Sequence, residues 1–234
     1  MKRSEINNIM LQGLNFLENE MHFLLPPFSR WTPEIWKSKG IESQDIVKQQ
    51  LGWDITDFGS EDFEKVGLFL FTIRNGSFEN LENGNGKCYA EKAMIVLEEQ
   101  ITPIHLHFQK MEDIINRGGG DLVIQLWNSF KNKDIDTVSD VVVSVDGVTN
   151  TIKAGGTITL TPGESVCLPQ LMYHKFWGKK GKGTTFVGEV SRVNDDFVDN
   201  YFYDNVGRFA DIDEDEAPQF LLYCDYKKYF NYKI

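Results

Sequence analysis

The residues with the clearest chemical potential in this chain are its histidines. There are four in all, and His105, His107 and His174 lie in the part of the chain that is rich in β-branched and aromatic residues. His105 and His107 are two positions apart in the segment ITPIHLHF, and alternate side chains of a strand project from the same face. Glu112 follows soon after His107, which lets the chain turn and bring a carboxylate to the same point. Three imidazoles and a carboxylate suit a divalent ion such as Mn, Fe, Co, Ni or Zn.

The alternative is that these histidines are packed core residues with no ligand. A single buried histidine most often has that role. The His105–x–His107 pair is different, because two imidazoles buried on one face need hydrogen-bond partners or a metal to offset their lost solvation. The spacing therefore favours a metal site.

A series of short strands is expected to position these side chains. From about residue 67 onward, runs rich in β-branched and aromatic residues alternate with turn residues, at the spacing typical of an antiparallel sandwich or small barrel. Val141–Val145, followed by Asp146-Gly147, is the strongest hairpin signal. The predicted strands are Leu68–Arg74, Tyr89–Glu98, Ile101–Phe108, Asp121–Trp127, Val138–Val145, Thr149–Lys153, Thr157–Thr161, Ser165–Leu168, Phe176–Gly178 and Thr184–Val190.

The two ends of the chain have a different texture. Residues 4–21 carry apolar side chains at three- and four-residue spacings and predict one amphipathic helix. We expect residues 1–66 to form a helical and irregular extension, 67–194 to form the β-barrel core, and 195–234 to form an irregular segment that completes the site. A length of 234 residues fits one such domain.

Net charge and cysteine content limit the kinds of partner and the cellular compartment that we expect for this chain. The formal net charge of −11 repels phosphate backbones and anionic lipid, so we expect neither nucleic acid nor membrane as a partner. The three cysteines are far apart, which argues against a disulfide framework and favours a reducing compartment. No stretch approaches the apolar length of a signal peptide centre or membrane span, and we expect the protein in the cytoplasm.

Longer motifs carry a family resemblance. His105-x-His107-x4-Glu112-x6-Gly119 resembles the first metal motif of the cupin superfamily, whereas PQLMYH, ending at His174, lacks the usual Pro-x-Gly spacing of the second. From about Leu68 to the C-terminus the chain resembles the D-lyxose ketol-isomerase family of cupin sugar isomerases. The motifs that carry this resemblance are residues 89–127, LMYHKFWG, VGEVSRVNDDFVDNYF and GRF with DEDEAPQFLLYCDY.

The resemblance implies a fold and an activity. The expected fold is a double-sheet cupin β-barrel, or jelly roll. The expected reaction interconverts D-lyxose with D-xylulose, and also D-mannose with D-fructose, through a metal-stabilised cis-enediolate. The implied ligands are His105, His107, Glu112 and His174. The implied metal is Mn²⁺, with Co²⁺, Zn²⁺ and Fe²⁺ as alternatives, and the implied assembly is a homodimer.

This reaction needs a group that moves a proton between C2 and C1. Lys110 is the first candidate because it lies between two implied ligands, and Glu189, at the end of a predicted strand, is the second. Expected substrate-binding residues are Arg74, Lys92, Asp199 and Arg208, together with Phe176 as an aromatic surface for the sugar.

Two other functions remain open from the sequence. Three histidines and a glutamate also hold iron in cupin dioxygenases. In a non-catalytic sugar-binding cupin, the metal would only brace the barrel.

Overall fold

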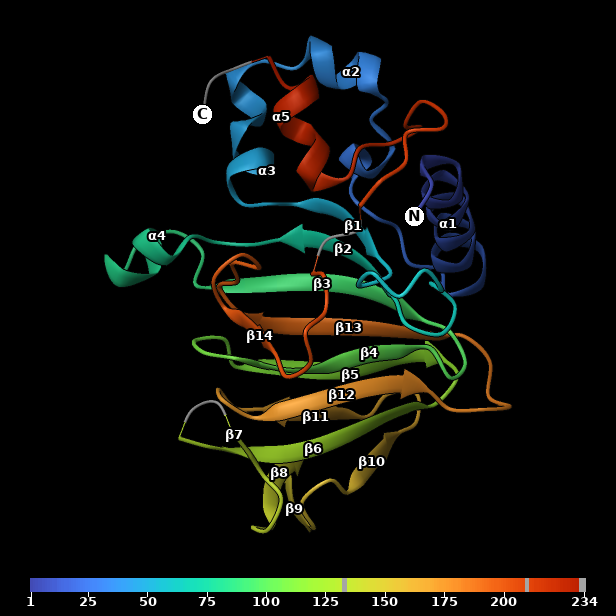
Figure 1. The fold of residues 1–234 in the computed structure, drawn as a ribbon. Coiled ribbons are helices and arrows are strands. Elements are labelled where there is room, and N and C mark those ends of the chain that lie inside the picture. Colours follow the sequence, from blue (N-terminus) through green and yellow to red (C-terminus); the bar gives the residue numbers. More distant parts are fainter. Residues whose placement is uncertain (132–133, 209–210, 232–234) are drawn as a thin grey trace.

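Two curled antiparallel sheets form the body of the molecule in a computed structural model that describes residues 1–131, 134–208 and 211–231 (Figure 1). The eight-stranded sheet has the order β1-β2-β3-β13-β5-β11-β8-β9. In the six-stranded sheet, five strands follow one another in the order β10-β6-β12-β4-β14. The first comprises β1 (Gly52–Thr56), β2 (Leu68–Arg74), β3 (Tyr89–Val96), β5 (Glu112–Gly119), β8 (Val141–Val145), β9 (Val148–Ile152), β11 (Ser165–Leu168) and β13 (Thr185–Arg192). The second comprises β4 (Ile101–His107), β6 (Leu122–Phe130), β10 (Thr157–Leu160), β12 (Tyr173–Gly178) and β14 (Asn200–Phe202), and β7 (Asp134–Asp136) pairs with β6.

This architecture confirms the predicted double-sheet cupin barrel with an N-terminal helix and an irregular C-terminal segment. The hairpin signal at Asp146-Gly147 is also confirmed, because β8 and β9 pair across that turn. Both turn residues have positive φ, the conformation that a two-residue hairpin turn of this kind requires.

Four strands, β1, β5, β7 and β14, were missing from the sequence prediction. β5 alternates buried and exposed positions over its first residues, with Glu112, Ile114 and Asn116 facing inward. β1 is buried along its whole length and lies in the segment that we expected to be helical and irregular. The division into 1–66, 67–194 and 195–234 stays our proposal for the chain's organisation. Within it, β1 and β14 come from the two outer segments and are hydrogen-bonded into the sheets.

The barrel interior is apolar at one end and polar at the other. Inward residues of both sheets, among them Ile124, Leu126, Val143 and Val166, form a buried apolar cluster. Burying apolar surface of this kind contributes about 25 cal/mol per Å² to the free energy of folding. This packing fixes the strands whose other inward side chains are charged.

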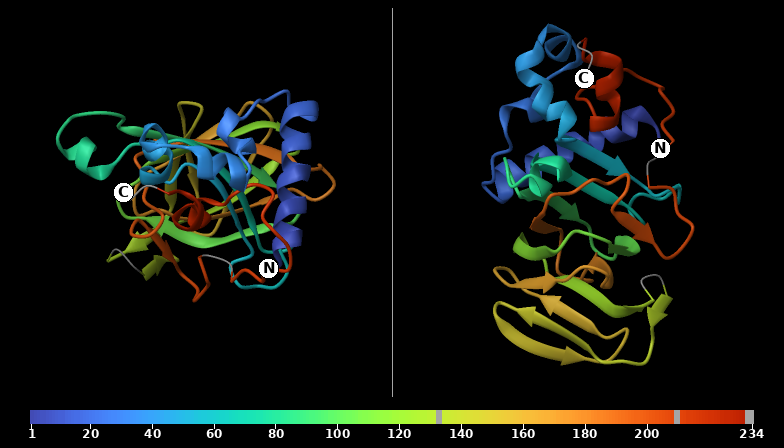
Figure 2. Two further views of the ribbon diagram at one scale, coloured as in Figure 1. Left: turned by 90° about the horizontal axis from the view of Figure 1, so that it is seen from above. Right: turned by 90° about the vertical axis from the view of Figure 1, so that its left-hand side faces the viewer.

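The helices lie outside the two sheets, and one of them, in the connection between β2 and β3, projects away from the strands (Figure 1). They are α1 (Arg3–Asn15), α2 (Pro33–Ser38), α3 (Gln44–Lys48), α4 (Phe78–Glu82) and α5 (Tyr226–Tyr229), with shorter helical turns at Phe16–Glu20, Pro27–Arg30, Ile41–Ser43 and Tyr223–Asp225. The predicted N-terminal helix is confirmed as α1 and the turn after it. The helix α1 near the N-terminus lies beside the strands (Figure 2). Ile6 and Met10 of α1 belong to the same buried apolar cluster as Phe69 and Phe71 of β2. A Cβ atom at Gly13 would lie 2.2 Å from the Phe69 ring, so only glycine permits this close approach.

Arg3 ties the start of the chain to its C-terminal segment. Its buried guanidinium donates to both carboxylate oxygens of Asp225 and to both of Glu214, each at 2.9 Å. Such paired, charge-assisted hydrogen bonds fix both position and direction. The segment that returns from β14 toward α5 is thereby held against the barrel. No helix in the described ranges is long and apolar enough to cross a bilayer.

Candidate active site

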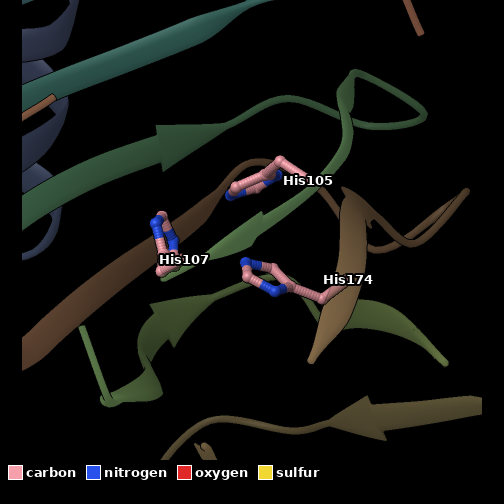
Figure 3. Close-up of side chains that lie close together, drawn as sticks. All are labelled: His105, His107 and His174. Atoms are coloured by element: carbon pink, nitrogen blue, oxygen red, sulfur yellow. The ribbon is translucent and has the colours of Figure 1, made fainter. Parts of the chain in front are cut away.

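The three predicted histidines meet inside the barrel. His105 and His107 lie on β4 and His174 lies on the neighbouring strand β12, where His174 is the register partner of His105 (Figure 3). All three side chains are buried, and their nearest ring nitrogens lie within 4.8 Å of one another. The i, i+2 spacing on one strand and the cross-strand pairing with the next together produce this convergence.

Backbone carbonyls fix the hydrogen positions on two of these rings. His105 Nδ1 lies 2.8 Å from the carbonyl oxygen of Pro103, and His174 Nδ1 lies 3.1 Å from that of Met172. A carbonyl oxygen only accepts, so each Nδ1 carries the hydrogen, and in the neutral ring each Nε2 presents a lone pair. This arrangement is the usual one for a histidine that binds metal through Nε2.

Glu112 completes the ligand set expected from the sequence. Its Oε1 atom lies 3.4 Å from His107 Nε2 and 3.2 Å from His174 Nε2, and it has no hydrogen-bond partner among the described residues. Where a carboxylate oxygen faces the lone pair of a neutral imidazole at such a distance, the contact is unfavourable unless a cation lies between them. A divalent metal ion supplies that cation, and the mixed nitrogen and oxygen donors suit it. The residues therefore fit the predicted metal.

The imidazoles are held in the form that binds metal. Burial, followed by the neighbouring His174 and His107, keeps the pKa of His105 well below its usual range. Burial and then Lys110 lower the pKa of His107. Both rings are consequently neutral near pH 7.

These shifts predict a loss of stability in acid. The unfolded chain takes up protons on its histidines below about pH 6.5, whereas the folded chain, with lowered pKa values, does not. The stability that the folded chain gains from these neutral histidines is fully present above about pH 6.5 and declines as the pH falls below that value. We expect the melting temperature to fall between pH 7 and pH 5, with a shallower fall for His105→Asn. A flat profile, or equal slopes for the two proteins, would contradict this assignment.

A chain of buried ion pairs leads away from the metal ligands. Lys110 Nζ lies 2.6 Å from Glu112 Oε2 and 2.8 Å from Glu189 Oε1. Lys92 Nζ lies 3.5 Å from the same Glu189 oxygen and 3.8 Å from Asp196 Oδ1. The series continues through Arg208, and all of these side chains line the cavity that contains the three histidines.

The ion pairs decide which groups are charged. Burial alone would raise the pKa of Glu112 and of Glu189, but Lys110 and its neighbours outweigh burial and lower both values. Burial alone would lower the pKa of Lys110, but Glu112 and Glu189 outweigh it and raise that pKa instead. Glu189 is therefore an available proton acceptor, whereas Lys110 stays protonated.

Five of the seven predicted catalytic and substrate-binding residues line this cavity. Lys110, Glu189, Lys92, Arg208 and Phe176 lie with the metal ligands. Phe176 contributes an apolar wall, and Phe202 adds a second ring that stacks on His105 with centroids 5.4 Å apart.

The structure places Arg74 and Asp199 outside the cavity lining. Strand alternation would point Arg74 inward with Leu70, but the register with β3 shifts between Thr72 and Arg74, and Arg74 instead pairs with Glu91 at the surface. Asp199 is fully buried and accepts hydrogen bonds from the backbone N–H groups of Gln109 and Lys110, at 2.7 and 3.1 Å. Asp199 therefore holds the loop that carries Lys110.

The set of substrate-binding residues expected from the sequence did not include two acidic residues of the site. Asp196 lines the cavity three positions before Asp199, and Asp54 of β1 pairs with Arg208. The alternation within WDIT around Asp54 was the available signal. A groove of about 950 Å³ also lies between α1 and residues 182–184, but its lining contains none of the three histidines.

Comparison with known proteins agrees with this chemistry. The family model for D-lyxose isomerase matches residues 1–226. D-lyxose/D-mannose isomerases of Escherichia coli O157:H7 and Serratia proteamaculans are each 44% identical over 231 residues, which cover 98% of this chain and 100% and 99% of theirs.

Solved structures confirm the fold. The L-ribose isomerase of Cellulomonas parahominis with L-ribose has a TM-score of 0.58 at 14% identity, and that of Acinetobacter sp. DL28 with L-ribose has 0.57 at 12% identity. Each alignment covers 91% of this chain and 98% of the other. The nearly full-length match to the family model and to the two relatives shows that this chain belongs to the D-lyxose isomerase family of aldose–ketose isomerases.

Proposed function

We propose that the chain is a metal-dependent isomerase that interconverts D-lyxose with D-xylulose and D-mannose with D-fructose. Family membership and the names of the two relatives support the substrate class. The single observation that carries the metal dependence is the contact between Glu112 Oε1 and two imidazole nitrogens, which calls for a cation between them. The ion pairs beside it supply the acid–base groups.

His105, His107, Glu112 and His174 would hold the metal, for which we propose Mn²⁺, with Co²⁺, Zn²⁺ and Fe²⁺ as alternatives. When bound there, a divalent ion draws electron density from the sugar oxygens at C1 and C2 and makes the C2 hydrogen more acidic. The buried network of Lys110, Lys92 and Arg208 with Glu112, Glu189, Asp196 and Asp54 has a formal charge of −1, which favours a divalent cation.

Glu189 is the residue we propose as the base that takes the proton from C2 and returns it to C1. Its carboxylate is buried and ionised. Lys110 lies between this carboxylate and the proposed metal ligand Glu112 and forms an ion pair with each. Lys110, our first candidate from the sequence, has a raised pKa and is better suited to stabilise negative charge on the cis-enediolate oxygens. Because a single carboxylate serves both carbons, solvent hydrogen can enter the product.

The far side of the cavity would bind the rest of the sugar. Hydroxyl groups of the sugar can accept hydrogen bonds from Lys92 and Arg208 and donate them to Asp196. Phe176 offers an apolar surface. We propose that C1 and C2 lie near the histidines and that the remaining carbons extend along the ion pairs toward Arg208.

The experiment that tests this function follows purified protein by NMR in D₂O with D-lyxose and D-mannose as separate substrates. We expect both to be converted to their 2-ketoses, with deuterium appearing at C1 of the ketose as solvent exchanges with the transferred proton. The absence of ketose from either sugar would refute the proposed substrates. Ketose without any deuterium would refute the proton transfer through Glu189.

His174→Ala should reduce metal occupancy without unfolding the barrel. The variant removes one ligand and leaves the Cβ in place, and loss of a ligand typically lowers metal affinity by a large factor. Elemental analysis after dialysis should show metal occupancy well below that of the wild type. The control is His22→Ala, at the exposed fourth histidine, which should keep the wild-type occupancy. Full occupancy in His174→Ala would contradict the ligand assignment.

We further propose that the protein acts in the cytoplasm as a homodimer. The net charge of −11 and the three unpaired cysteines support a reducing, aqueous compartment. Sedimentation of the purified chain tests the dimer directly, and a monomer at micromolar concentration would refute it.

A further inference from the structure

Asp54 is a buried acidic residue on a strand that contributes no residue to the lining of the catalytic cavity. It lies in the middle of β1, where its neighbours Trp53 and Ile55 face outward into the apolar cluster under α1. Asp54 projects from the opposite face, on the side where its register partner Leu70 lines the cavity. It is 5% exposed, and placing a carboxylate there is costly unless a specific partner requires it.

That partner is Arg208. Asp54 Oδ2 lies 2.5 Å from Arg208 Nη2, and Asp196 Oδ2 lies 3.1 Å from the same nitrogen. Arg208 lines the cavity, whereas Asp54 is absent from the described lining residues and lies behind Arg208. The guanidinium is thus held between a carboxylate from a sheet strand and one from the loop that follows β13.

The two carboxylates differ in the rigidity of their support. Asp54 lies in a five-residue strand whose residues all pair with β2. Asp196 lies in the turn at 195–199, and Arg208 lies beyond β14 in irregular chain. Of the two contacts, only the one to Asp54 ties the guanidinium to a strand of the sheet. A binding group on irregular chain needs such support to keep its geometry.

We propose that Asp54 is a positioning residue that sets the orientation of Arg208 and, through it, the binding of the sugar carbons beyond C3. This inference rests on the proposed function, because it assumes that C1 and C2 lie at the histidines. Asp54 acts on substrate affinity and on discrimination by chain length, and the proton transfer at Glu189 does not depend on it.

The test compares Asp54→Asn with wild type on D-lyxose and on L-erythrose, which keeps the configuration of lyxose at C2 and C3 but lacks the fifth carbon. For D-lyxose we expect KM to rise about tenfold, the size of effect that a charge-assisted hydrogen bond to a ligand carries, with little change in kcat. The kcat/KM for L-erythrose should change far less. A general loosening of the fold would affect both sugars alike.

Asp57→Asn is the matched control. Asp57 is also buried, lies directly after β1, and accepts a hydrogen bond from the Gly59 N–H. We expect it to leave both substrates unchanged. If Asp54→Asn does not fold, Asp54→Glu keeps the charge but displaces the guanidinium, and the same selective rise in KM is expected.

The outcomes separate this inference from the function on which it rests. Absence of lyxose turnover by the wild type would refute the proposed function. Wild-type turnover, together with a folded Asp54 variant that shows unchanged KM or equal losses on both sugars, would overturn the role of Asp54 alone.

Discussion

Glu189→Gln should lower kcat for D-lyxose by about 10³-fold, within the range by which general base catalysis accelerates proton transfer. The amide is nearly isosteric with the carboxylate and keeps an oxygen that can accept from Lys110 and Lys92, but it does not take a proton from carbon. Metal occupancy should stay at the wild-type level, because Glu189 is not one of the four proposed ligands. KM should change much less than kcat, since the lost interaction belongs to the transition state.

The control for this variant is Glu91→Gln on the neighbouring strand β3. Glu91 pairs at the surface with Arg74, outside the cavity lining, and its substitution should leave kcat unchanged. Exchange of the C2 hydrogen with solvent, measured by NMR, should be lost with turnover in Glu189→Gln. If kcat of Glu189→Gln stays within about tenfold of the wild-type value, another group must be the base.

Lys110→Met should damage both stability and turnover. The ammonium lies between Glu112 and Glu189, and each of the three side chains is at most 4% exposed. Removing it leaves two buried carboxylates without their shared counter-ion, and breaking a buried ion pair in this way costs about 3–5 kcal/mol. For a chain of this size we expect the melting temperature to fall by roughly 10 °C or more.

The loss of Lys110 should also change the chemistry. Without the ammonium, the pKa values of Glu112 and Glu189 rise, so the first becomes a weaker ligand and the second a less available proton acceptor. Lys65→Met is a suitable control, because Lys65 forms an ion pair of similar length with Asp62 but is 81% exposed. A folded Lys110→Met protein with wild-type kcat would contradict the proposed role and favour a metal that only braces the barrel.

The sequence was sufficient where the chemistry depends on local periodicity. Two histidines at i, i+2 on a strand share a face whatever the rest of the fold does, and β4 confirms this for His105 and His107. The hairpin at Asp146-Gly147 is equally local. Position along the chain, supported by the family resemblance, added Glu112 and His174, and the need for a proton-transfer group added Lys110 and Glu189. The structure brings all four into the same cavity.

Sequence reasoning was insufficient where one residue changes the direction of a side chain. The register shift before Arg74 turns that residue outward, although simple alternation predicts an inward cation. In the turn at 195–199, both Asp196 and Asp199 are buried, and only the tertiary structure shows that the first faces the cavity while the second binds the backbone of the loop at Lys110. Asp54 was missed because its short strand lies in the segment that we expected to be helical and irregular.

The central claim is that His105, His107, Glu112 and His174 enclose a divalent ion without which no sugar is isomerised. The most direct test measures the rate of D-lyxose conversion on one protein sample before chelation, after chelation and dialysis, and after Mn²⁺ is added back. The account predicts turnover in the first state, none above background in the second, and recovery in the third. Full turnover by protein that elemental analysis shows to be free of metal would contradict it.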